Sequence, residues 1–165
     1  PVNYYIFTMD VTRLNDDYVK ITDQQVELLK KIAISRNQNS DVRLFDVSDI
    51  YDKEFKGCVN ETAYCTPYTL LRLLADEVEE IPDKILYLDA DVMANGDISE
   101  LYNIDVDKYE FAAVKEKYGS WLIAPDYFNA GVLLLNMKMI KKTGLFKNGR
   151  ELLRKYNSCF SNFFS

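Results

Sequence analysis

Two aspartates in the middle of the chain have the residue type and spacing of a cation site. Asp89 and Asp91 end the apolar stretch that covers residues 84–92. Side chains alternate along a strand, so both carboxylates lie on the same side if the extended backbone continues through them. Two carboxylates about 4 Å apart repel by roughly 4 kcal/mol at an effective dielectric near 20, and a divalent cation between them reverses that repulsion. Oxygen ligands of this kind suit Mg2+, Mn2+ or Ca2+.

The element that positions these aspartates is predicted to be a strand buried on both faces. Residues 84–88 have strand length, are mostly apolar and contain neither Gly nor Pro. An open α/β sheet binds ligands at the carboxyl ends of its strands, and Asp89 and Asp91 stand at such an end. The alternative is that both are solvated acids that leave a strand before a turn at Asn95-Gly96.

The N-terminal part of the chain predicts a β-α-β unit. Residues 4–9 and 42–47 are the two strands, and they are expected to be parallel with a right-handed connection. The helix between them begins with a capping box formed by Thr22 and Gln25. Four apolar residues at helical spacing form its predicted buried face: Val26, Leu29, Ile32 and Ala33.

Residues 48–61 are predicted to be an irregular connection, and a helix follows from Thr66-Pro67. Its predicted buried stripe is Leu70, Leu71, Leu74 and Val78. Arg72 lies off that stripe, and its plainest role is an exposed i,i+4 ion pair with Asp76.

Beyond the aspartates, the pattern predicts a short helix over 97–102, a strand over 110–114 and a polar loop over 115–126. The apolar part of residues 127–136 reads as a second fully buried strand, and Gly131 at its start indicates close approach of a neighbour or ligand. Helices are expected over 137–142 and from Asn148, the latter with inward-facing Leu152, Leu153 and Tyr156. Nothing resembles a linker, so residues 1–165 are predicted to be one domain.

The composition narrows the classes of function. The chain has 165 residues, 48% hydrophobic content and a net charge of −6, which argues against a nucleic-acid partner. It has no histidine, so neither a histidine base nor a histidine metal ligand lies within it. Cys58, Cys65 and Cys159 are expected to be free thiols, which favours a cytoplasmic location. No signal-peptide pattern or membrane-spanning run is present.

Three motifs together resemble glycosyltransferase family 8, which includes lipopolysaccharide galactosyl- and glucosyltransferases and the glycogenins. The first is Leu86-Tyr87-Leu88-Asp89-Ala90-Asp91-Val92 followed by residues 96–101, the second covers residues 127–136, and the third is the helix over 68–74. They occur in the family's order, and the likeness extends from Tyr4 to about Tyr156.

The resemblance implies a GT-A fold, a mixed and mainly parallel α/β sheet with helices on both faces. It implies a retaining transfer of glucose or galactose from UDP-glucose or UDP-galactose to a saccharide or lipid-linked saccharide acceptor, in lipopolysaccharide or other surface-glycan synthesis, with Mn2+ or Mg2+. By position, Asp89 and Asp91 would bind the metal and Ala90 the nucleotide. Arg72 would bind the donor's phosphate or sugar. Asn129, Ala130 and Gly131 would line the donor-sugar pocket.

The chain departs from the family pattern at both ends. It is expected to start at the family's second strand, and the family's histidine metal ligand and Asp-Gln pair have no counterpart before Ser165. No residue is therefore assigned as a nucleophile or base, and we expect a partial catalytic domain.

Two alternatives stay open. One is a non-catalytic relative that binds a sugar nucleotide or a protein. The other is a haloacid-dehalogenase-type phosphatase with Asp89 as nucleophile, against which Met93 and the two preceding strands argue.

Overall fold

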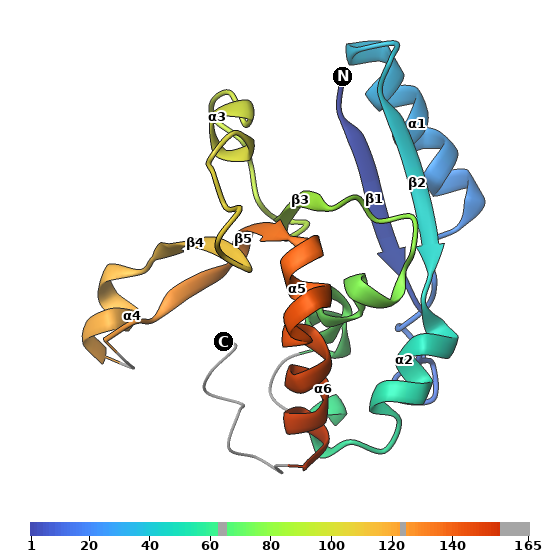
Figure 1. Cartoon of the computed structure of the whole chain (residues 1–165). Coiled ribbons are helices and arrows are strands. Elements are labelled where there is room, and N and C mark those ends of the chain that lie inside the picture. Colours follow the sequence, from blue (N-terminus) through green and yellow to red (C-terminus); the bar gives the residue numbers. More distant parts are fainter. Residues whose placement is uncertain (63–65, 123–124, 156–165) are drawn as a thin grey trace. The chain divides into compact units, whose positions relative to one another are not determined.

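The computed structural model describes residues 1–62, 66–122 and 125–155, shown in Figure 1. The chain forms two compact units. Among the described residues, unit 1 consists of those within 1–74 and of 153–155, and unit 2 consists of those within 75–152. The assignment of residues 1–165 to one catalytic domain stays a prediction.

Unit 1 contains the predicted β-α-β unit. Strands β1 (Asn3–Thr8) and β2 (Asp41–Asp46) pair in parallel over their whole length, from Asn3↔Asp41 to Thr8↔Asp46. Helix α1 (Asp23–Arg36) connects them and packs on β2 (Figure 1). The Tyr5 and Phe45 rings stack across the two strands, with centroids 6.2 Å apart. Parallel pairing through a crossover helix is therefore confirmed.

Helix α1 begins with the predicted capping box. The Thr22 hydroxyl accepts from the Gln25 backbone N–H (3.3 Å), and the Gln25 side chain accepts from the Thr22 backbone N–H (2.8 Å). Its predicted apolar face is only half right, because Val26 and Ala33 are buried whereas Leu29 and Ile32 are 37% and 51% exposed. A two-stranded sheet offers the helix a narrow strip to pack on, so fewer residues of the face reach it.

The stretch predicted to be irregular is largely helical, which corrects the sequence interpretation. It contains α2 (Ser48–Phe55) and the short 3-10 helix η1 (Val59–Thr62). The Asp46 carboxylate accepts from the Ser48 backbone N–H (3.0 Å) and from its hydroxyl (2.5 Å), which satisfies donors at the start of α2. Tyr51 and Phe55, one helical turn apart, are fully buried. That i,i+4 aromatic pair is the signal that predicts this helix.

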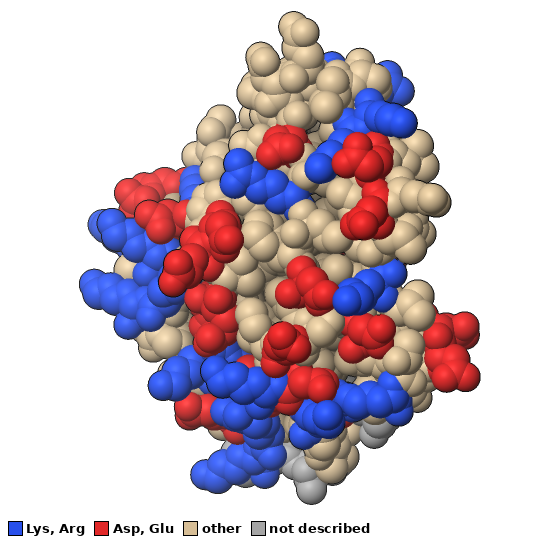
Figure 2. All heavy atoms as spheres, turned by 90° about the vertical axis from the view of Figure 1, so that its right-hand side faces the viewer, with Lys and Arg blue, Asp and Glu red and all other residues tan. Residues whose placement is uncertain are grey.

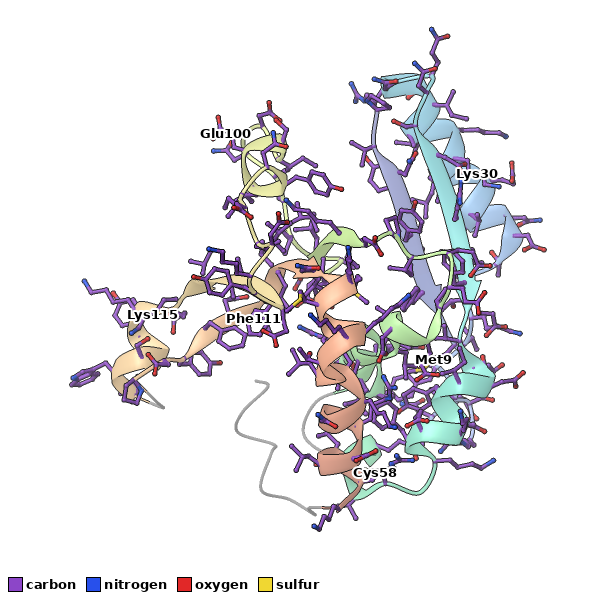
Figure 3. All side chains as sticks on the ribbon, in the orientation of Figure 1. Met9, Lys30, Cys58, Glu100, Phe111 and Lys115 are labelled. Atoms are coloured by element: carbon purple, nitrogen blue, oxygen red, sulfur yellow. The ribbon has the colours of Figure 1, made fainter. Side chains whose placement is uncertain are left out.

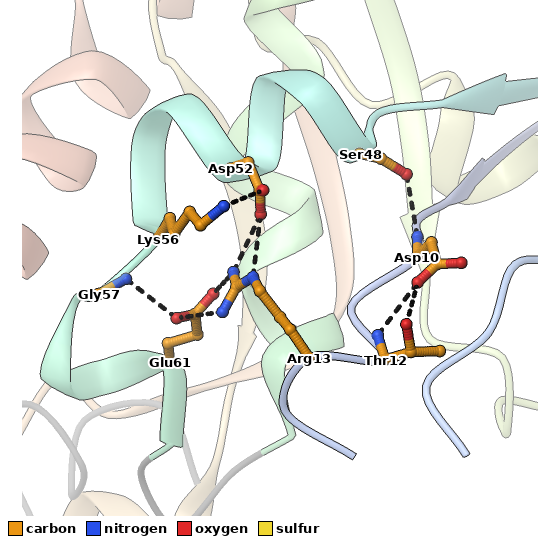
Figure 4. Close-up of polar contacts among 8 residues, drawn as sticks. All are labelled: Asp10, Thr12, Arg13, Ser48, Asp52, Lys56, Gly57 and Glu61. Carbon is orange, nitrogen blue, oxygen red and sulfur yellow. Dashed lines mark hydrogen bonds and ion pairs between the residues drawn. The ribbon is translucent and has the colours of Figure 1, made fainter. Parts of the chain in front are cut away.

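Arg13 ties the loop after β1 to α2 and η1 (Figure 4). Its guanidinium pairs with Asp52 (3.0 Å) and, in a very short contact, with Glu61, which is 3% exposed. The Gly57 backbone N–H also donates to Glu61 (3.2 Å). Hydrogen bonding to Glu61 raises the pKa of Arg13 above its usual range, against the effect of burial. Beside this cluster, hydrogen bonds from Thr12 lower the pKa of Asp10.

The helix predicted after Thr66 is the 3-10 helix η2 (Pro67–Glu77). Leu70, Leu74 and Val78 of the predicted stripe are buried, whereas Leu71 is half-buried. The tighter 3-10 winding places side chains three residues apart on one edge, which departs from the α-helical phase used for the prediction.

Unit 2 is built on a three-stranded antiparallel sheet with strand order β3-β5-β4. The strands are β3 (Lys84–Leu88), β4 (Phe111–Lys115) and β5 (Phe128–Asn136). Figure 3 shows Phe111 on β4, whose ring lies 5.4 Å from that of Phe128. The mixed α/β class is confirmed, but among the described strands one pair is parallel and two are antiparallel.

The prediction that residues 84–88 are buried on both faces is wrong for the described structure. Strand β3 lies at one edge of its sheet, no residue from Lys84 to Leu88 is fully buried, and Leu88 is 38% exposed. The central position belongs to β5, where Leu133, Leu134 and Leu135 are buried but the first residues are exposed. Both strands are rich in apolar residues, and apolar content alone cannot say which of them is central.

Four α-helices complete unit 2 in the described residues: α3 (Ser99–Tyr102), α4 (Lys117–Leu122), α5 (Met137–Thr143) and most of α6 (Leu145–Lys155). Helix α4 lies within a segment predicted to be a loop. Helix α6 begins three residues before the predicted Asn148, just after Gly144 ends α5 with a φ of +70°. Leu153 is buried, but Leu152 is 45% exposed, which corrects that prediction; Tyr156 lies outside the described residues.

Arg150 is the charged centre of the unit 2 core. It is 1% exposed and pairs with Asp76 and Glu77, each at 2.5 Å. Because two carboxylates neutralise it, this guanidinium can be buried at a tolerable free-energy cost. Asp76, assigned from the sequence to an exposed pair with Arg72, is thus a partner of Arg150.

Acidic and basic side chains are interspersed on the face shown in Figure 2. Exposed ion pairs of unit 1 include Lys20–Asp46 (3.0 Å) and Arg43–Asp41 (3.1 Å). Cys58 is a free thiol that donates to the Leu153 carbonyl (3.1 Å), and the other two cysteines lie outside the described residues.

Within the described ranges, every helix is too short or too polar to cross a membrane. The cytoplasmic location stays a prediction.

Candidate functional site

Asp89 and Asp91 lie where β3 turns away from its sheet. The strand ends at Leu88, and the Asp89 carbonyl accepts from the Val92 N–H (3.1 Å), which closes a tight turn over residues 89–92. The extended backbone therefore does not continue to Asp91, and simple alternation does not decide where its side chain points. Asp89 is half-buried, whereas Ala90 and Asp91 are exposed. The turn presents one anchored and one exposed carboxylate, with the Ala90 backbone between them.

Gly131 lies directly against the Asp89 carboxylate. The Asp89 backbone N–H donates to the Gly131 carbonyl (2.9 Å), which continues the β3–β5 ladder by one position. A Cβ atom on Gly131 would be 2.9 Å from Asp89 Oδ2 and 3.0 Å from Asn129 Oδ1. A larger residue would therefore force the Asp89 or Asn129 side chain to move, and the close approach predicted from the sequence is confirmed.

Strand β5 is irregular at residues 129–131, the segment that lies beside Asp89. The consecutive β4 residues Ala113 and Val114 pair with Leu133 and Asn129, so the register between β4 and β5 shifts there. Residues 130–132 lie between these two pairs. Bulges of this kind bend a strand and redirect its side chains, and they are common beside active sites.

Asn129 stabilises the irregular backbone with its own side chain. Its Oδ1 accepts from the Gly131 backbone N–H at 2.7 Å. Because the side-chain oxygen of Asn129 faces the Gly131 N–H, the side-chain nitrogen and its two N–H donors point away from Gly131. Asn129 is exposed, so those donors can reach a polar ligand such as a sugar hydroxyl.

Tyr87 is a member of this cluster that the sequence analysis did not assign. Its hydroxyl donates a very short hydrogen bond to Asp89 Oδ1. Residues 87 and 89 share one side of the strand because side chains alternate, so the i,i+2 spacing was the available signal. The structure therefore brings together Tyr87, Asp89, Asn129 and Gly131, with Ala90 and Asp91 in the adjoining turn.

The oxygen ligands of this cluster suit a hard cation that also binds ligands from outside the protein, such as water or phosphate. Asp89 and Asp91 contribute oxygen ligands, and no group of three or more acidic or thiol side chains arranged for a metal occurs in the part of the chain that the structure describes. Mg2+ is commonly held by one or two carboxylates together with water and substrate phosphates. The residues present thus fit an Mg2+ or Mn2+ site that the ligand itself completes.

Arg72 belongs to unit 1, while the other predicted site residues belong to unit 2. It is half-buried in η2, and its Nε donates to the Thr69 carbonyl (3.1 Å). Burial of this kind argues against the fully solvated surface role considered from the sequence.

Comparison with known proteins identifies relatives of this arrangement. The family described as "Glycosyl transferase family 8" matches residues 2–161. A Haemophilus influenzae protein that bears a glycosyltransferase name is 28% identical over 95% of this chain and 46% of its own length. The lipopolysaccharide 1,3-galactosyltransferase of Salmonella typhimurium is 33% identical over 50% of this chain and 28% of its own length.

A solved structure shares the fold. The galactosyltransferase LgtC, in complex with donor and acceptor sugar analogues, superposes with a TM-score of 0.57 at 19% identity, over 98% of this chain and 70% of that one. This likeness shows the GT-A fold. The chain spans less than half the length of the curated relatives named above.

Proposed function

Because the chain belongs to glycosyl transferase family 8, we propose that the protein transfers a hexose from a UDP-sugar to an acceptor hydroxyl, with retention of anomeric configuration. The observation that carries the proposal is the packing of Gly131 against the Asp89 carboxylate, which puts the carboxylate that we propose as a cation ligand beside the irregular strand segment 129–131. UDP-glucose and UDP-galactose are the proposed donors. The acceptor is a saccharide or a lipid-linked saccharide, in lipopolysaccharide or other surface-glycan synthesis.

In this proposal the two aspartates hold Mn2+ or Mg2+ on the donor diphosphate. When bound, the cation neutralises charge that develops on the diphosphate as the glycosidic bond breaks. Asp89 lies at the end of β3 against Gly131, whereas the exposed Asp91 would supply the second oxygen ligand from the turn. The Ala90 backbone, between them, contacts the nucleotide.

Residues 129–131 are proposed to form one wall of the donor-sugar pocket. The Asn129 amide donates to a sugar hydroxyl, and Gly131 and Ala130 leave room for the ring. Asn129 is suited to this role because its amide oxygen is already used by the Gly131 N–H (2.7 Å), which fixes the direction of the amide nitrogen.

Arg72 is proposed to bind the donor phosphate or sugar. A guanidinium makes bidentate contacts to phosphate oxygens that an ammonium cannot reproduce. This role is proposed from the family pattern and from the half-buried position of Arg72 in η2.

The proposal is tested by transfer assays on the full-length protein. UDP release from UDP-glucose and UDP-galactose is measured with Mn2+, with Mg2+ and with excess EDTA, and the anomeric configuration of the product is read by NMR. We expect metal-dependent turnover with retention, lost in Asp89→Asn and Asp91→Asn variants that still unfold cooperatively. Full activity in excess EDTA contradicts the metal assignment. UDP-sugar binding without turnover favours the non-catalytic alternative.

A further inference from the structure

We propose that Tyr87 is a positioning residue that holds the Asp89 carboxylate in its cation-binding orientation. The inference rests on the proposed function, since it takes Asp89 as a metal ligand. It adds a residue that the sequence motifs do not assign. The role is that of a hydrogen-bond donor in the shell behind a ligating carboxylate, where such partners orient the ligand and tune its affinity.

The geometry constrains the Asp89 side chain from two directions. The Tyr87 hydroxyl donates to Oδ1 in a very short hydrogen bond. Oδ2 lies on the side of Gly131, where a Cβ atom would come within 2.9 Å of it. The backbone at Asp89 and at the preceding residue is also fixed. The Asp89 N–H donates to the Gly131 carbonyl (2.9 Å), and Leu88 pairs with Val132.

Tyr87 itself is well suited to hold a side chain still. It lies within β3 opposite Leu133 of β5, and Leu133 is buried. The phenol has only two side-chain torsions, so little conformational freedom opposes its hydrogen bond. An ionised carboxylate offers about four lone-pair directions, so a bond from Tyr87 to Oδ1 is compatible with a cation on the same group. Loss of the hydroxyl would remove one of the contacts that orient the Asp89 carboxylate without removing a ligand.

The chain offers a matched control for this hydroxyl. Tyr102 of α3 donates to the carbonyl of Lys84, at the opposite end of the same strand (3.2 Å). Tyr102→Phe therefore removes one tyrosine hydroxyl that bonds at one end of β3, as Tyr87→Phe does at the other end, but away from the aspartates. Both variants keep the aromatic ring and its packing.

The test is Mn2+ binding to the full-length protein by calorimetry and by EPR of the free ion, in the presence of UDP. We expect Tyr87→Phe to weaken Mn2+ about tenfold, in the usual range for loss of such a partner. Tyr102→Phe is expected to bind Mn2+ within twofold of wild type. The thermal unfolding midpoints of the two variants should be similar. If the role of Tyr87 were purely structural, Tyr87→Phe would not lose Mn2+ affinity selectively while its midpoint stayed close to that of Tyr102→Phe.

An Asp89→Asn variant distinguishes a failure of the positioning role of Tyr87 from a failure of the proposed metal site. If Asp89→Asn loses Mn2+ but Tyr87→Phe binds it as tightly as Tyr102→Phe does, the positioning role is wrong and the metal site stands. If Asp89→Asn binds Mn2+ like wild type, the proposed metal site itself is wrong. If Tyr87→Phe loses Mn2+ only in proportion to a fall in its unfolding midpoint, Tyr87 is structural and the inference is overturned.

Discussion

Replacement of Gly131 by alanine is the sharpest perturbation that the site geometry suggests. The new Cβ would be 2.9 Å from Asp89 Oδ2, about 0.5 Å inside ordinary van der Waals contact. Asp89 must then move, because the strand backbone behind it is held by the ladder between β3 and β5. Active-site groups need placement within about 0.5 Å, and a displacement of about 1 Å can cost roughly a hundredfold in rate. We expect Gly131→Ala to lower the donor kcat/KM at least about tenfold, or roughly 1.4 kcal/mol.

Folding stability should change much less than activity. Overpacking a confined site costs about 1–3 kcal/mol, with the low end expected at a half-buried position. Gly131 does not have a positive φ, so alanine can adopt its backbone and should recover about 0.4–1 kcal/mol by restricting the unfolded chain. The net change in the free energy of unfolding should therefore stay within about 1 kcal/mol, measured by urea denaturation.

Gly149 in α6 supplies the control for this substitution. A Cβ there would meet nothing within 4 Å. Gly149→Ala should keep wild-type kinetics and stabilise the helix by about 0.5–1 kcal/mol. Wild-type donor kcat/KM in Gly131→Ala would refute the idea that Gly131 sets the position of Asp89.

Three other substitutions probe the rest of the chain. Arg72→Lys should lower donor kcat/KM at least about tenfold without loss of stability; a change below twofold would remove Arg72 from the site. Asp76→Ala should destabilise the fold by about 3–5 kcal/mol in urea denaturation, because it leaves Arg150 buried beside a single carboxylate. Asp46→Asn should cost about 1 kcal/mol at pH 7. That difference should begin to fall below about pH 4 and disappear as the pH passes through the lowered folded pKa of Asp46, and a pH-independent difference would contradict it.

The pH dependence of the last variant follows from the direction of the shift. Burial raises the pKa of Asp46, but hydrogen bonds from Ser48 and Lys20 outweigh it and hold the pKa below its usual value. A carboxyl whose pKa is lowered in the folded state stabilises that state above the unfolded pKa, near 3.9. The contribution is lost as the pH falls through the folded pKa. Equilibrium unfolding between pH 2 and 7 measures it.

The local elements of unit 1 were predictable because short-range chemistry decides them. The capping box of Thr22 and Gln25 and the parallel pairing of β1 and β2 both appear as expected. Helix α2 was missed because the polar residues around Tyr51 and Phe55 obscured their i,i+4 spacing. Leu29 and Ile32 were misplaced because helix periodicity does not say how wide the surface opposite the helix is.

The candidate site was predictable in its residues but not in its geometry. The motif and Gly131 indicated a close approach, and the structure brings Gly131 to Asp89. The turn at residues 89–92, the register shift beside Asn129 and the hydrogen bond from Tyr87 depend on pairing between distant strands. Pairing of that kind depends on sequence separation and packing rather than on local pattern. Asp76 is another example of a contact that depends on distant residues. Arg72, four residues earlier, predicted a surface ion pair, but the partner in the structure is Arg150, far along the chain.

Metal-dependent binding of UDP to the full-length protein tests the central claim most directly. UDP affinity is measured by calorimetry with saturating Mn2+ and with EDTA, in the wild type and in Asp89→Asn. We expect at least about tenfold tighter UDP binding with Mn2+ in the wild type, and no gain from Mn2+ in Asp89→Asn. An equal gain from Mn2+ in both proteins would contradict the assignment of Asp89 to the cation on the donor diphosphate.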